Sequence, residues 1–368
     1  MVKEKISSSQ LVLLIIPMII ATEFMSVPGV IYQFAKEDDW LSYLLSLITG
    51  VWAILVFTTL ASRHPGMTFP EYLEKIMGKW LGKAVSMFYM YYLFLYVTTI
   101  SDEVMSFITL FAQPKTPRMV TLGLFVAVCG IGAWLGIEVL ARCSELLIPL
   151  SIIFSVVIAA LLLPEMVPNF LTPVFGRGIV PILQGAVVPS GWAGEFFLLG
   201  FLLPYLNDPS KARAFSFTGL LAVALIMMLV IVVSTTVNGP LTGQLKYAYY
   251  NAVRYLSIGE FLERIDPVIV GVWVYNGFLK TALFLWAFVL CIAQVFGVVK
   301  YRFLALPVTL LSIVGCLWAF SNAVDLSNFL TFTFPTESLV TQDIIPTLIL
   351  GVDLIRSRKR EKYAKVVA

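Results

Sequence analysis

Two apolar stretches of this chain, about half its length apart, are each interrupted near the centre by proline, glycine and a carboxylate. The first covers residues 15–29 and the second covers residues 187–195. A straight membrane helix has no use for such residues at mid-depth, because each leaves backbone groups or a charge unpaired in hydrocarbon. Matching interruptions in two halves of a chain indicate the substrate site of a transporter-like fold built from repeats.

The composition agrees with a membrane location. The chain is 59% hydrophobic and only 13% charged, with a mean hydropathy of +0.91, whereas soluble proteins average about a quarter charged residues. No cleavable signal is evident, so the first span is expected to act as an uncleaved anchor. The four cysteines sit singly in apolar surroundings and are interpreted as small hydrophobic residues, not as metal ligands or a disulfide framework.

A window of about 20 apolar residues per crossing predicts about ten membrane spans. Their approximate limits are 9–33, 40–61, 82–111, 119–136, 143–163, 180–205, 213–237, 265–296, 303–321 and 336–355. Lysine and arginine are concentrated in every second connection and in the basic tail, so the positive-inside rule places both termini in the cytoplasm. Two cytoplasmic termini require an even number of spans.

The chain is expected to form a single membrane domain, residues 1–368. It divides into a first five-helix repeat at 9–163, a second at 180–355 and a basic cytoplasmic tail at 356–368. Because each half has an odd number of spans, the second half enters the membrane in the opposite orientation, and similar halves form an inverted repeat. The interrupted first span then corresponds to the interrupted sixth span.

Two connections have structure of their own. Thr68, Pro70 and Glu71 predict the start of a short interfacial helix within residues 62–78. The long aromatic stretch from Asn238 to Asp266 has two interpretations of equal weight: an amphipathic lid over the outer mouth, or an aromatic belt at the membrane surface.

The first interruption supplies candidate binding groups. If the span unwinds near Ala21, Thr22 and Glu23, its freed backbone groups could hold the carboxylate and ammonium of a zwitterion. The alternative is a proline-kinked helix in which Glu23 pairs with a neighbour. Two interruptions at matching positions favour the binding site.

The sixth span has a flexible centre at Pro189, Ser190 and Gly191, and Glu195 follows about one turn later. A buried carboxylate costs about 2.5–3.5 kcal/mol on insertion scales unless it is paired, protonated or hydrated. Its candidate roles are pairing with a lysine, binding a substrate ammonium or carrying a proton. A structural ion pair is the alternative.

Lys280 is the only basic residue well inside a span. A buried lysine must find a carboxylate or backbone carbonyls, or lose its proton. In an inverted-repeat fold of this kind the eighth span packs beside the first. Other proteins with such a fold hold a sodium ion there. Our hypothesis is that the Lys280 ammonium replaces that cation, with Glu23 or freed carbonyls as its partner.

Hydroxyls and rings share one face of the third span. Tyr92, Tyr96, Thr99 and Glu103 recur at helical spacing. Packing and cavity lining are equally plausible roles for Tyr96 and Thr99. Before the fifth span, Glu138 and Arg142 have the spacing of an intrahelical ion pair, which we interpret as structural.

Motifs for nucleotide hydrolysis and metal catalysis are absent from the sequence. It has no glycine-rich phosphate loop, no His-Glu-x-x-His and one histidine, His64. No enzymatic activity, cofactor or metal site is therefore predicted, and no nucleic-acid partner.

Five short motifs resemble the spore germination protein family over nearly the whole chain. They are Ile6-Ser-x-x-Gln-Leu, Glu138-x-x-Ala-Arg-x-x-Glu145, the stretch from Ile258 to Asp266, Phe278-Leu-Lys280, and Tyr301-Arg302 with Leu306-Pro307. The family comprises the B subunits of endospore germinant receptors and is related to the amino acid/polyamine/organocation (APC) superfamily of permeases. The resemblance implies an all-α integral membrane protein with the LeuT-type five-plus-five inverted repeat and broken helices 1 and 6.

The resemblance implies a sensor that binds a small germinant, often an amino acid, in the spore inner membrane and works with an A subunit and a C lipoprotein. The family's binding positions fall on Ala21 and Thr22, on Tyr96 and Thr99, around Pro189 to Gly191, and from Lys280 through Thr281 to Phe284. Relatives commonly have Gly-x-Gly in the first break, whereas this chain has Ala21-Thr22-Glu23. Ala21 and Glu23 narrow the space near the backbone, so the ligand need not be an ordinary amino acid.

Two other functions remain open at this stage. The chain could be an amino acid permease that works by alternating access, with protons carried through Glu23 or Glu195. Sensing could also open a water or ion path through the fold. Composition does not separate these functions.

Overall fold

The computed structural model describes residues 4–111, 113, 115–256 and 266–367, with backbone alone at 266–268 and 358–367. This described part is helical, and its one β-type pairing is an isolated bridge between Ile6 and Leu206. Its α-helices are α1 (Ser8–Ala35), α2 (Asp39–Arg63), α3 (Phe69–Met77), α4 (Lys79–Phe111), α5 (Arg118–Leu135), α6 (Ile137–Leu162), α7 (Ile179–Ala193), α8 (Leu199–Leu202), α9 (Ala212–Asn238), α10 (Ala248–Arg254), α11 (Asp266–Phe296), α12 (Ala305–Ala319), α13 (Ala323–Asn328), α14 (Phe334–Ser338) and α15 (Ile345–Val367).

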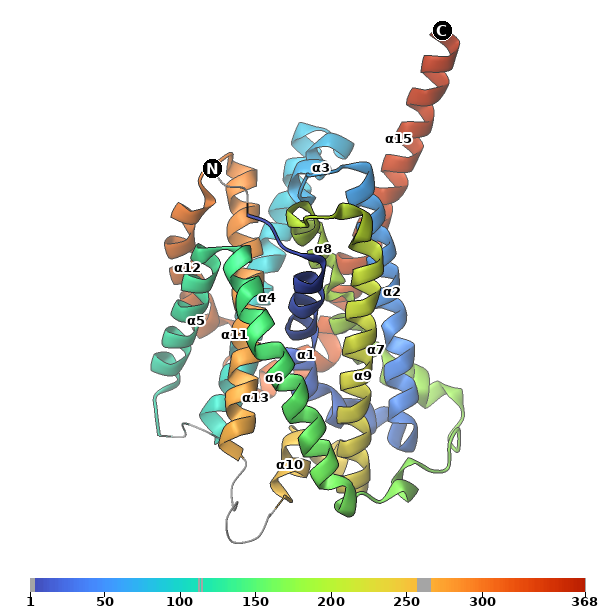
Figure 1. Cartoon of the computed structure of the whole chain (residues 1–368), viewed down its shortest axis with the longest axis vertical. Coiled ribbons are helices and arrows are strands. Elements are labelled where there is room, and N and C mark those ends of the chain that lie inside the picture. The colour runs from blue at the N-terminus through green and yellow to red at the C-terminus, as the bar shows by residue number, and fades with distance from the viewer. Residues whose placement is uncertain (1–3, 112, 114, 257–265, 368) are drawn as a thin grey trace.

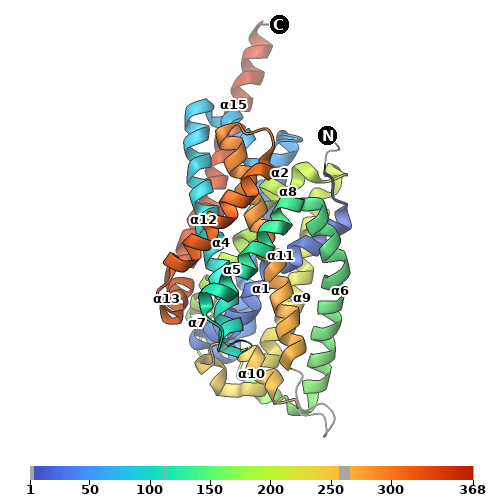
Figure 2. The same cartoon turned by 90° about the vertical axis from the view of Figure 1, so that its left-hand side faces the viewer.

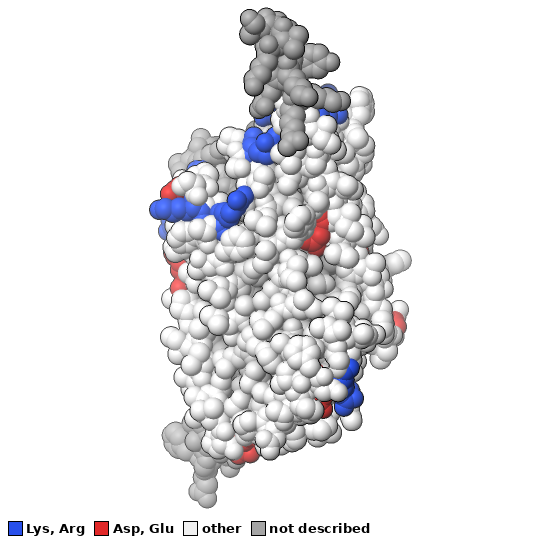
Figure 3. Space-filling model, turned by 90° about the vertical axis from the view of Figure 1, so that its right-hand side faces the viewer, with Lys and Arg blue, Asp and Glu red and all other residues white. Residues whose placement is uncertain are grey.

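The helices form a bundle of membrane-spanning length. Nine helical segments in the described ranges are long and apolar enough to cross a membrane. The first, residues 8–63, contains both α1 and α2, which run in opposite directions (Figure 1) and so account for two crossings. The expectation of about ten spans is confirmed. Figure 3 shows a face with Lys and Arg gathered toward its two ends and a largely uncharged surface between them, broken by scattered acidic spots.

Both chain ends lie at the same end of the bundle. In Figure 1, α1 begins and α15 ends at the top, as an even number of crossings requires. Which side of the membrane this end faces stays a prediction. We call it the terminal end, and the opposite end the distal end.

The break expected in the first span is absent from the structure, whereas the sixth span does change its helix type. α1 continues without a break from Ser8 to Ala35, with Pro17 and Pro28 inside it. A proline removes one backbone donor but need not end a membrane helix whose neighbours surround it, and α1 packs against α6, α7, α9 and α11. In the sixth span, the backbone changes from α-helix to a 3-10 segment at Gly194–Leu198, just after the Pro189–Gly191 stretch where flexibility was expected.

α1 lies inside the bundle. Figure 2 shows α6 at one edge and α13 at the other, with α1 and α11 between them. The middle of α1 is buried continuously from Leu14 to Thr22. A buried helix in a membrane bundle must satisfy its polar side chains against neighbouring helices. The polar residues of α1 therefore define where the bundle carries chemistry.

Short contacts join the connections at the terminal end. Ile6 pairs with the loop after α8: its N–H donates to Tyr205 O at 2.9 Å, and Asn207 N–H donates to Ile6 O at 2.9 Å. Glu4 Oε1 accepts from Arg302 Nη2 at 2.6 Å and from Tyr301 Oη at 2.9 Å. Both loops belong to the second half, so the N-terminal segment ties the start of the first half to the second.

The predicted interfacial helix is present as α3. Thr68 caps it, and the Glu71 carboxylate accepts from the Thr68 backbone N–H at 2.8 Å. Such a capping box fixes the start of a helix. Phe69, Tyr72 and Ile76 of α3 are buried, so α3 packs against the bundle with its apolar face inward.

Aromatic residues close the distal end. Tyr249 of α10 packs against Phe24 at 4.6 Å between ring centroids, and Trp273 packs against Phe107 at 3.9 Å. Because these rings belong to α1, α4, α10 and α11, the stretch after Asn238 covers helix ends, which favours a lid over a surface belt. Residues 257–265, which include most of the Ile258–Asp266 motif and Phe261, lie outside the described residues.

Candidate functional site

A buried ion pair lies near the midpoint of α11. The Lys280 ammonium donates to Glu195 Oε1 at 2.7 Å, and both side chains are 0% exposed. Lys280 also donates to Thr22 Oγ1 at 2.8 Å and lies 3.4 Å from Ile19 O. One ammonium therefore connects α11 to α1 and to the 3-10 segment that follows α7.

Glu195 is shared by two donors. Its Oε1 accepts from Tyr96 Oη of α4 at 2.6 Å as well as from Lys280. Its Oε2 has no hydrogen-bond partner among the described residues. Glu195 thus brings α4 into the cluster and retains one unused acceptor, and a buried unused acceptor is a candidate contact for a bound molecule.

Thr22 is the second junction. Its hydroxyl accepts from Trp192 Nε1 at 2.9 Å in addition to Lys280. Trp192 lies three residues before Glu195, and both are buried. Trp192 of the sixth span therefore bonds directly to α1, and Glu195 is joined to the same residue of α1 through Lys280.

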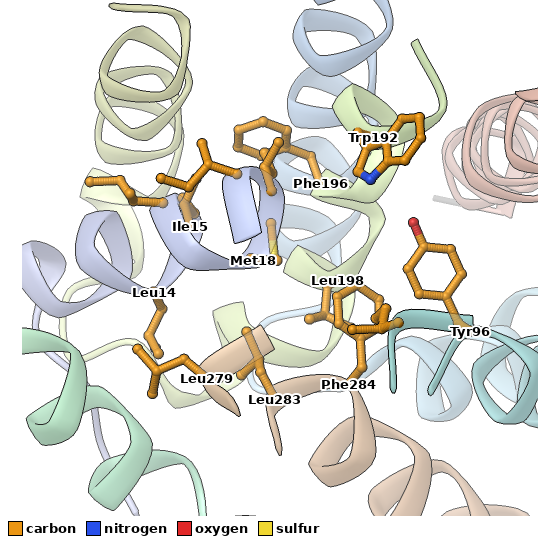
Figure 4. Close-up of a cluster of buried hydrophobic side chains, with 14 of the residues drawn as sticks. Leu14, Ile15, Met18, Tyr96, Trp192, Phe196, Leu198, Leu279, Leu283 and Phe284 are labelled. Atoms are coloured by element: carbon orange, nitrogen blue, oxygen red, sulfur yellow. The ribbon is translucent and has the colours of Figure 1, made fainter. Parts of the chain in front are cut away.

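Aromatic rings enclose this cluster. Tyr96 stacks on Phe284 with centroids 4.7 Å apart, and Trp192 meets Phe334 edge-on at 4.8 Å. Figure 4 shows Tyr96 and Trp192 on the same side of a buried group that includes Met18 and Phe284. Rings around a charged pair exclude water, which strengthens the electrostatic interactions inside. We call Thr22, Tyr96, Trp192, Glu195 and Lys280 the central cluster.

Glu23 does not pair with Lys280. Its Oε2 accepts from Tyr43 Oη of α2 at 3.4 Å, and its Oε1 has no partner in the described part of the chain. On a continuous helix Glu23 points away from its neighbour Thr22, because successive side chains are about 100° apart. The expectation that Glu23 is the lysine's partner is corrected to Glu195. A backbone carbonyl does approach the ammonium at Ile19 O, but α1 is continuous there, so this carbonyl is not freed by a break as expected.

Other predicted residues lie near the cluster without joining its hydrogen bonds. The Thr99 hydroxyl donates to Leu95 O of its own helix at 2.9 Å, and that of Ser190 donates to Val187 O at 2.6 Å. Gly191 lets Phe334 approach closely, since an added Cβ would lie 2.7 Å from the ring. Thr281 Oγ1 is buried with no partner among the described residues.

The two remaining candidates line neighbouring space. Ala21 lies in the wall of a small apolar cavity between α1, α6 and α11. Pro189 is buried in α7. Neither side chain offers a polar contact, so their contribution is limited to shape.

A larger cavity lies toward the distal end and borders the central cluster at Trp192. It has a volume of about 320 Å³. Its lining includes Ser26, Glu103, Trp192 and Lys246. Glu103 Oε1 accepts from Ser26 Oγ at 2.6 Å, and burial lowers the pKa of Lys246 from its usual value. Trp192 thus both lines this cavity and donates to Thr22 of the central cluster.

Three contributors were missed from the sequence. Trp192, Tyr43 and Gln342 were not proposed as site residues. Gln342 of the last span donates to Tyr92 Oη at 2.8 Å. An amide inside an apolar span costs free energy unless it finds a partner, so Gln342 carried a usable signal. Trp192 and Tyr43 are aromatic residues in apolar surroundings and gave none.

Among the described residues, no group of three or more His, Cys, Asp or Glu side chains could hold a metal ion. The central cluster instead offers an ammonium, a carboxylate oxygen, hydroxyls and a backbone carbonyl. These groups suit hydrogen bonding to a small polar molecule.

The family follows from comparison with known sequences. The profile of the family described as spore germination protein matches residues 5–324. The chain belongs to this family. It is 24% identical to spore germination protein KB of Bacillus subtilis (strain 168), over 98% of each chain. It is 27% identical to spore germination protein YndE of the same strain, over 79% of this chain and 81% of that protein.

Two solved structures share the fold of this chain. It matches MhsT in complex with L-phenylalanine with a TM-score of 0.67 and 13% identity, over 96% of this chain and 97% of that one. It matches Mhp1, a nucleobase-cation-symport-1 family transporter, with a TM-score of 0.55 and 13% identity, over 95% and 78% of the two chains. The expected all-helical class with a LeuT-type fold is confirmed.

Proposed function

We propose that this chain is the germinant-sensing membrane subunit of a spore germination receptor. It binds a small solute at mid-membrane, and binding shifts a conformational equilibrium that is passed to an A subunit and a C lipoprotein. We propose the inner membrane of the endospore as its location, with both termini in the cytoplasm. Family membership and the fold support this function over an enzymatic one.

The observation that carries the proposal is the Lys280–Glu195 pair with its shared donors. Four membrane spans, the first, third, sixth and eighth, meet in one buried polar cluster, so a solute that competes for Thr22, Tyr96 or Glu195 changes how these spans hold together. Ala21, Thr99, Pro189, Ser190, Gly191, Thr281 and Phe284 are proposed to shape the surrounding space, and Glu23 to act through Tyr43.

Solute access is proposed from the distal cavity past Trp192. Lys280 supplies a fixed positive charge beside Ile19 O, so solute binding needs no sodium. A solute with both a carboxylate and an ammonium fits the charges offered, because Lys280 and Lys246 attract the first and Glu195 and Glu103 attract the second.

The test is a thermal-shift screen of the purified chain against amino acids, sugars and nucleosides, in sodium and in choline buffer. A stabilising ligand is expected to lose its effect in Tyr96→Phe and Thr22→Trp. Thr218→Val is the matched control, since the Thr218 hydroxyl bonds only within its own helix. A ligand that still stabilises Thr22→Trp, or that requires sodium, contradicts the proposed site.

A permease is the second candidate, because the solved fold relatives include a transporter. Saturable uptake of the stabilising ligand into proteoliposomes that contain this chain alone would favour the permease. Binding without uptake favours the sensor.

A further inference from the structure

A second polar cavity opens at the terminal end, away from the central cluster. It has a volume of about 290 Å³ and is formed where the ends of α2 and α3 meet α15. It is lined by Arg63, His64, Lys75, Ile76, Asp353, Arg356 and Ser357. The proposed solute site uses none of these residues.

Positive charge predominates in this cavity. Three cationic side chains, Arg63, Lys75 and Arg356, face a single carboxylate, Asp353. Arg63 pairs with Asp353, whereas Lys75 makes no ion pair within the part of the chain that the structure describes. An arrangement with more cations than anions attracts an anionic group.

His64 supplies an independent indication of a ligand. It is 6% exposed, and its Nδ1 has no hydrogen-bond partner among the described residues. Its Nε2 lies 3.2 Å from Asp353 Oδ1, and its ring stacks on Tyr72. A buried ring nitrogen without a partner is costly. An anionic oxygen in the cavity would stabilise the protonated ring, which donates from Nδ1–H to the anion while Nε2–H faces Asp353, and so would remove that cost.

Exposed apolar side chains border the cavity, as expected of a site at the depth of lipid headgroups. Leu354 and Ile355, between Asp353 and Arg356 on α15, are 40% and 60% exposed. Trp80, just after α3, is 85% exposed. Large apolar side chains exposed beside a ring of cations mark the boundary between acyl chains and headgroups, where basic pockets between helices bind anionic lipids.

We propose that this cavity binds the phosphate of an anionic phospholipid. The phosphate oxygens accept from Lys75, Arg356 and His64, and the acyl chains lie along Leu354 and Ile355. The bound lipid bridges α3 and α15, which also pack against each other and share a hydrogen bond from Arg356 to Ile76 O. It therefore holds the last membrane helix against the interfacial helix.

The test uses the full chain in nanodiscs of phosphatidylcholine with increasing phosphatidylglycerol. The melting temperature of the wild type is expected to rise with phosphatidylglycerol, and native mass spectrometry is expected to show retained anionic lipid. Lys75→Gln should weaken lipid affinity by about fivefold, from about 1 kcal/mol per basic residue near the membrane. Arg356→Gln should weaken it similarly.

Lys79→Gln is the matched control, because Lys79 is exposed at the same end but does not line the cavity. Equal lipid dependence in the Lys75 and Lys79 variants would overturn the proposal, since the effect would then be general surface charge. Lys75 is exposed and makes no ion pair in the described structure, so its variant should fold even if Arg356→Gln does not. Stabilisation of the detergent-solubilised chain by millimolar inorganic phosphate, without any lipid effect, would assign the cavity to a soluble anion instead.

Discussion

Lys280 and Glu195 form a 2.7 Å ion pair with neither side chain exposed. The pair joins the eighth span to the sixth, and its hydrogen bonds extend to the first and third spans. Two charges taken out of water stabilise a fold only when both remain paired. The pair is therefore sensitive to the loss of either member.

Single substitutions of this pair should be costly and strongly coupled. Lys280→Met or Glu195→Leu alone should lower the free energy of unfolding by about 3–5 kcal/mol, because each leaves an unpaired buried charge. The double variant should lose much less than the sum of the two. Unfolding in detergent, followed for all four proteins of the cycle, measures the coupling. Strictly additive losses would show that the pair is not formed.

Gly29 should not tolerate a side chain. An added Cβ would lie 2.4 Å from Leu245 O, a backbone atom that cannot move independently. Gly29→Ala should therefore destabilise the chain by about 1–3 kcal/mol through overpacking. In contrast, Gly123→Ala on α5 meets nothing within 4 Å and should stabilise by about 0.5–1 kcal/mol. Shifts in melting temperature of opposite sign for the two variants would confirm the close contact of α1 with Leu245. An unchanged melting temperature for Gly29→Ala would refute it.

Two arginine–carboxylate pairs should contribute differently to the free energy of unfolding. Arg118 Nη2 lies 2.6 Å from Asp102 Oδ1, whose side chain is 0% exposed. Arg142 and Glu138 form the predicted intrahelical pair at 2.7 Å, and Arg142 is 69% exposed. Arg118→Gln should cost about 3 kcal/mol because it strands a buried carboxylate. Arg142→Gln should cost less than about 1 kcal/mol. Equal unfolding free energies for the two variants would contradict the difference in burial.

His64 predicts a pH dependence with a defined sign. Burial lowers the pKa of His64, and Arg63 of α2 and Lys75 of α3 act in the same direction, whereas Asp353 of α15 opposes them. The unfolded chain therefore binds this proton more readily, near its ordinary pKa of about 6.5. The stability present above that pH is lost as the pH falls below it. His64 is the only histidine, so melting temperatures of His64→Gln should decline less over this range. Identical profiles for both proteins would exclude the effect.

The sequence predicted the fold more fully than the site. Long apolar runs and the placement of lysine and arginine determine the number of crossings, because hydrocarbon admits few alternatives. Lys280 and Glu195 were identified because a charge inside such a run needs a partner. Which partner it finds depends on how each helix is rotated about its axis, and that rotation follows from packing across the whole bundle. This is why Glu23 was proposed for Lys280 and Glu195 was found.

The continuity of α1 was likewise not predictable from local residues. Pro17 and Pro28 usually indicate a break in an isolated helix. In the bundle, neighbouring helices surround α1, so the same residues stay inside one helix. Trp192 was missed because an aromatic residue in an apolar span has no local mark of its hydrogen bond to Thr22.

The contacts of the first described residues have a mechanical consequence. Glu4 holds Tyr301 and Arg302 before α12, and Ile6 is paired with the loop at Leu206. These residues directly precede α1, so they act as a latch across the two halves. Any outward motion of the start of α1 must therefore break the contacts of Glu4 and those of Ile6 together. Deleting residues 1–6 would therefore remove both sets of contacts and let this end of the bundle open. A tag placed before Glu4 would leave both sets in place.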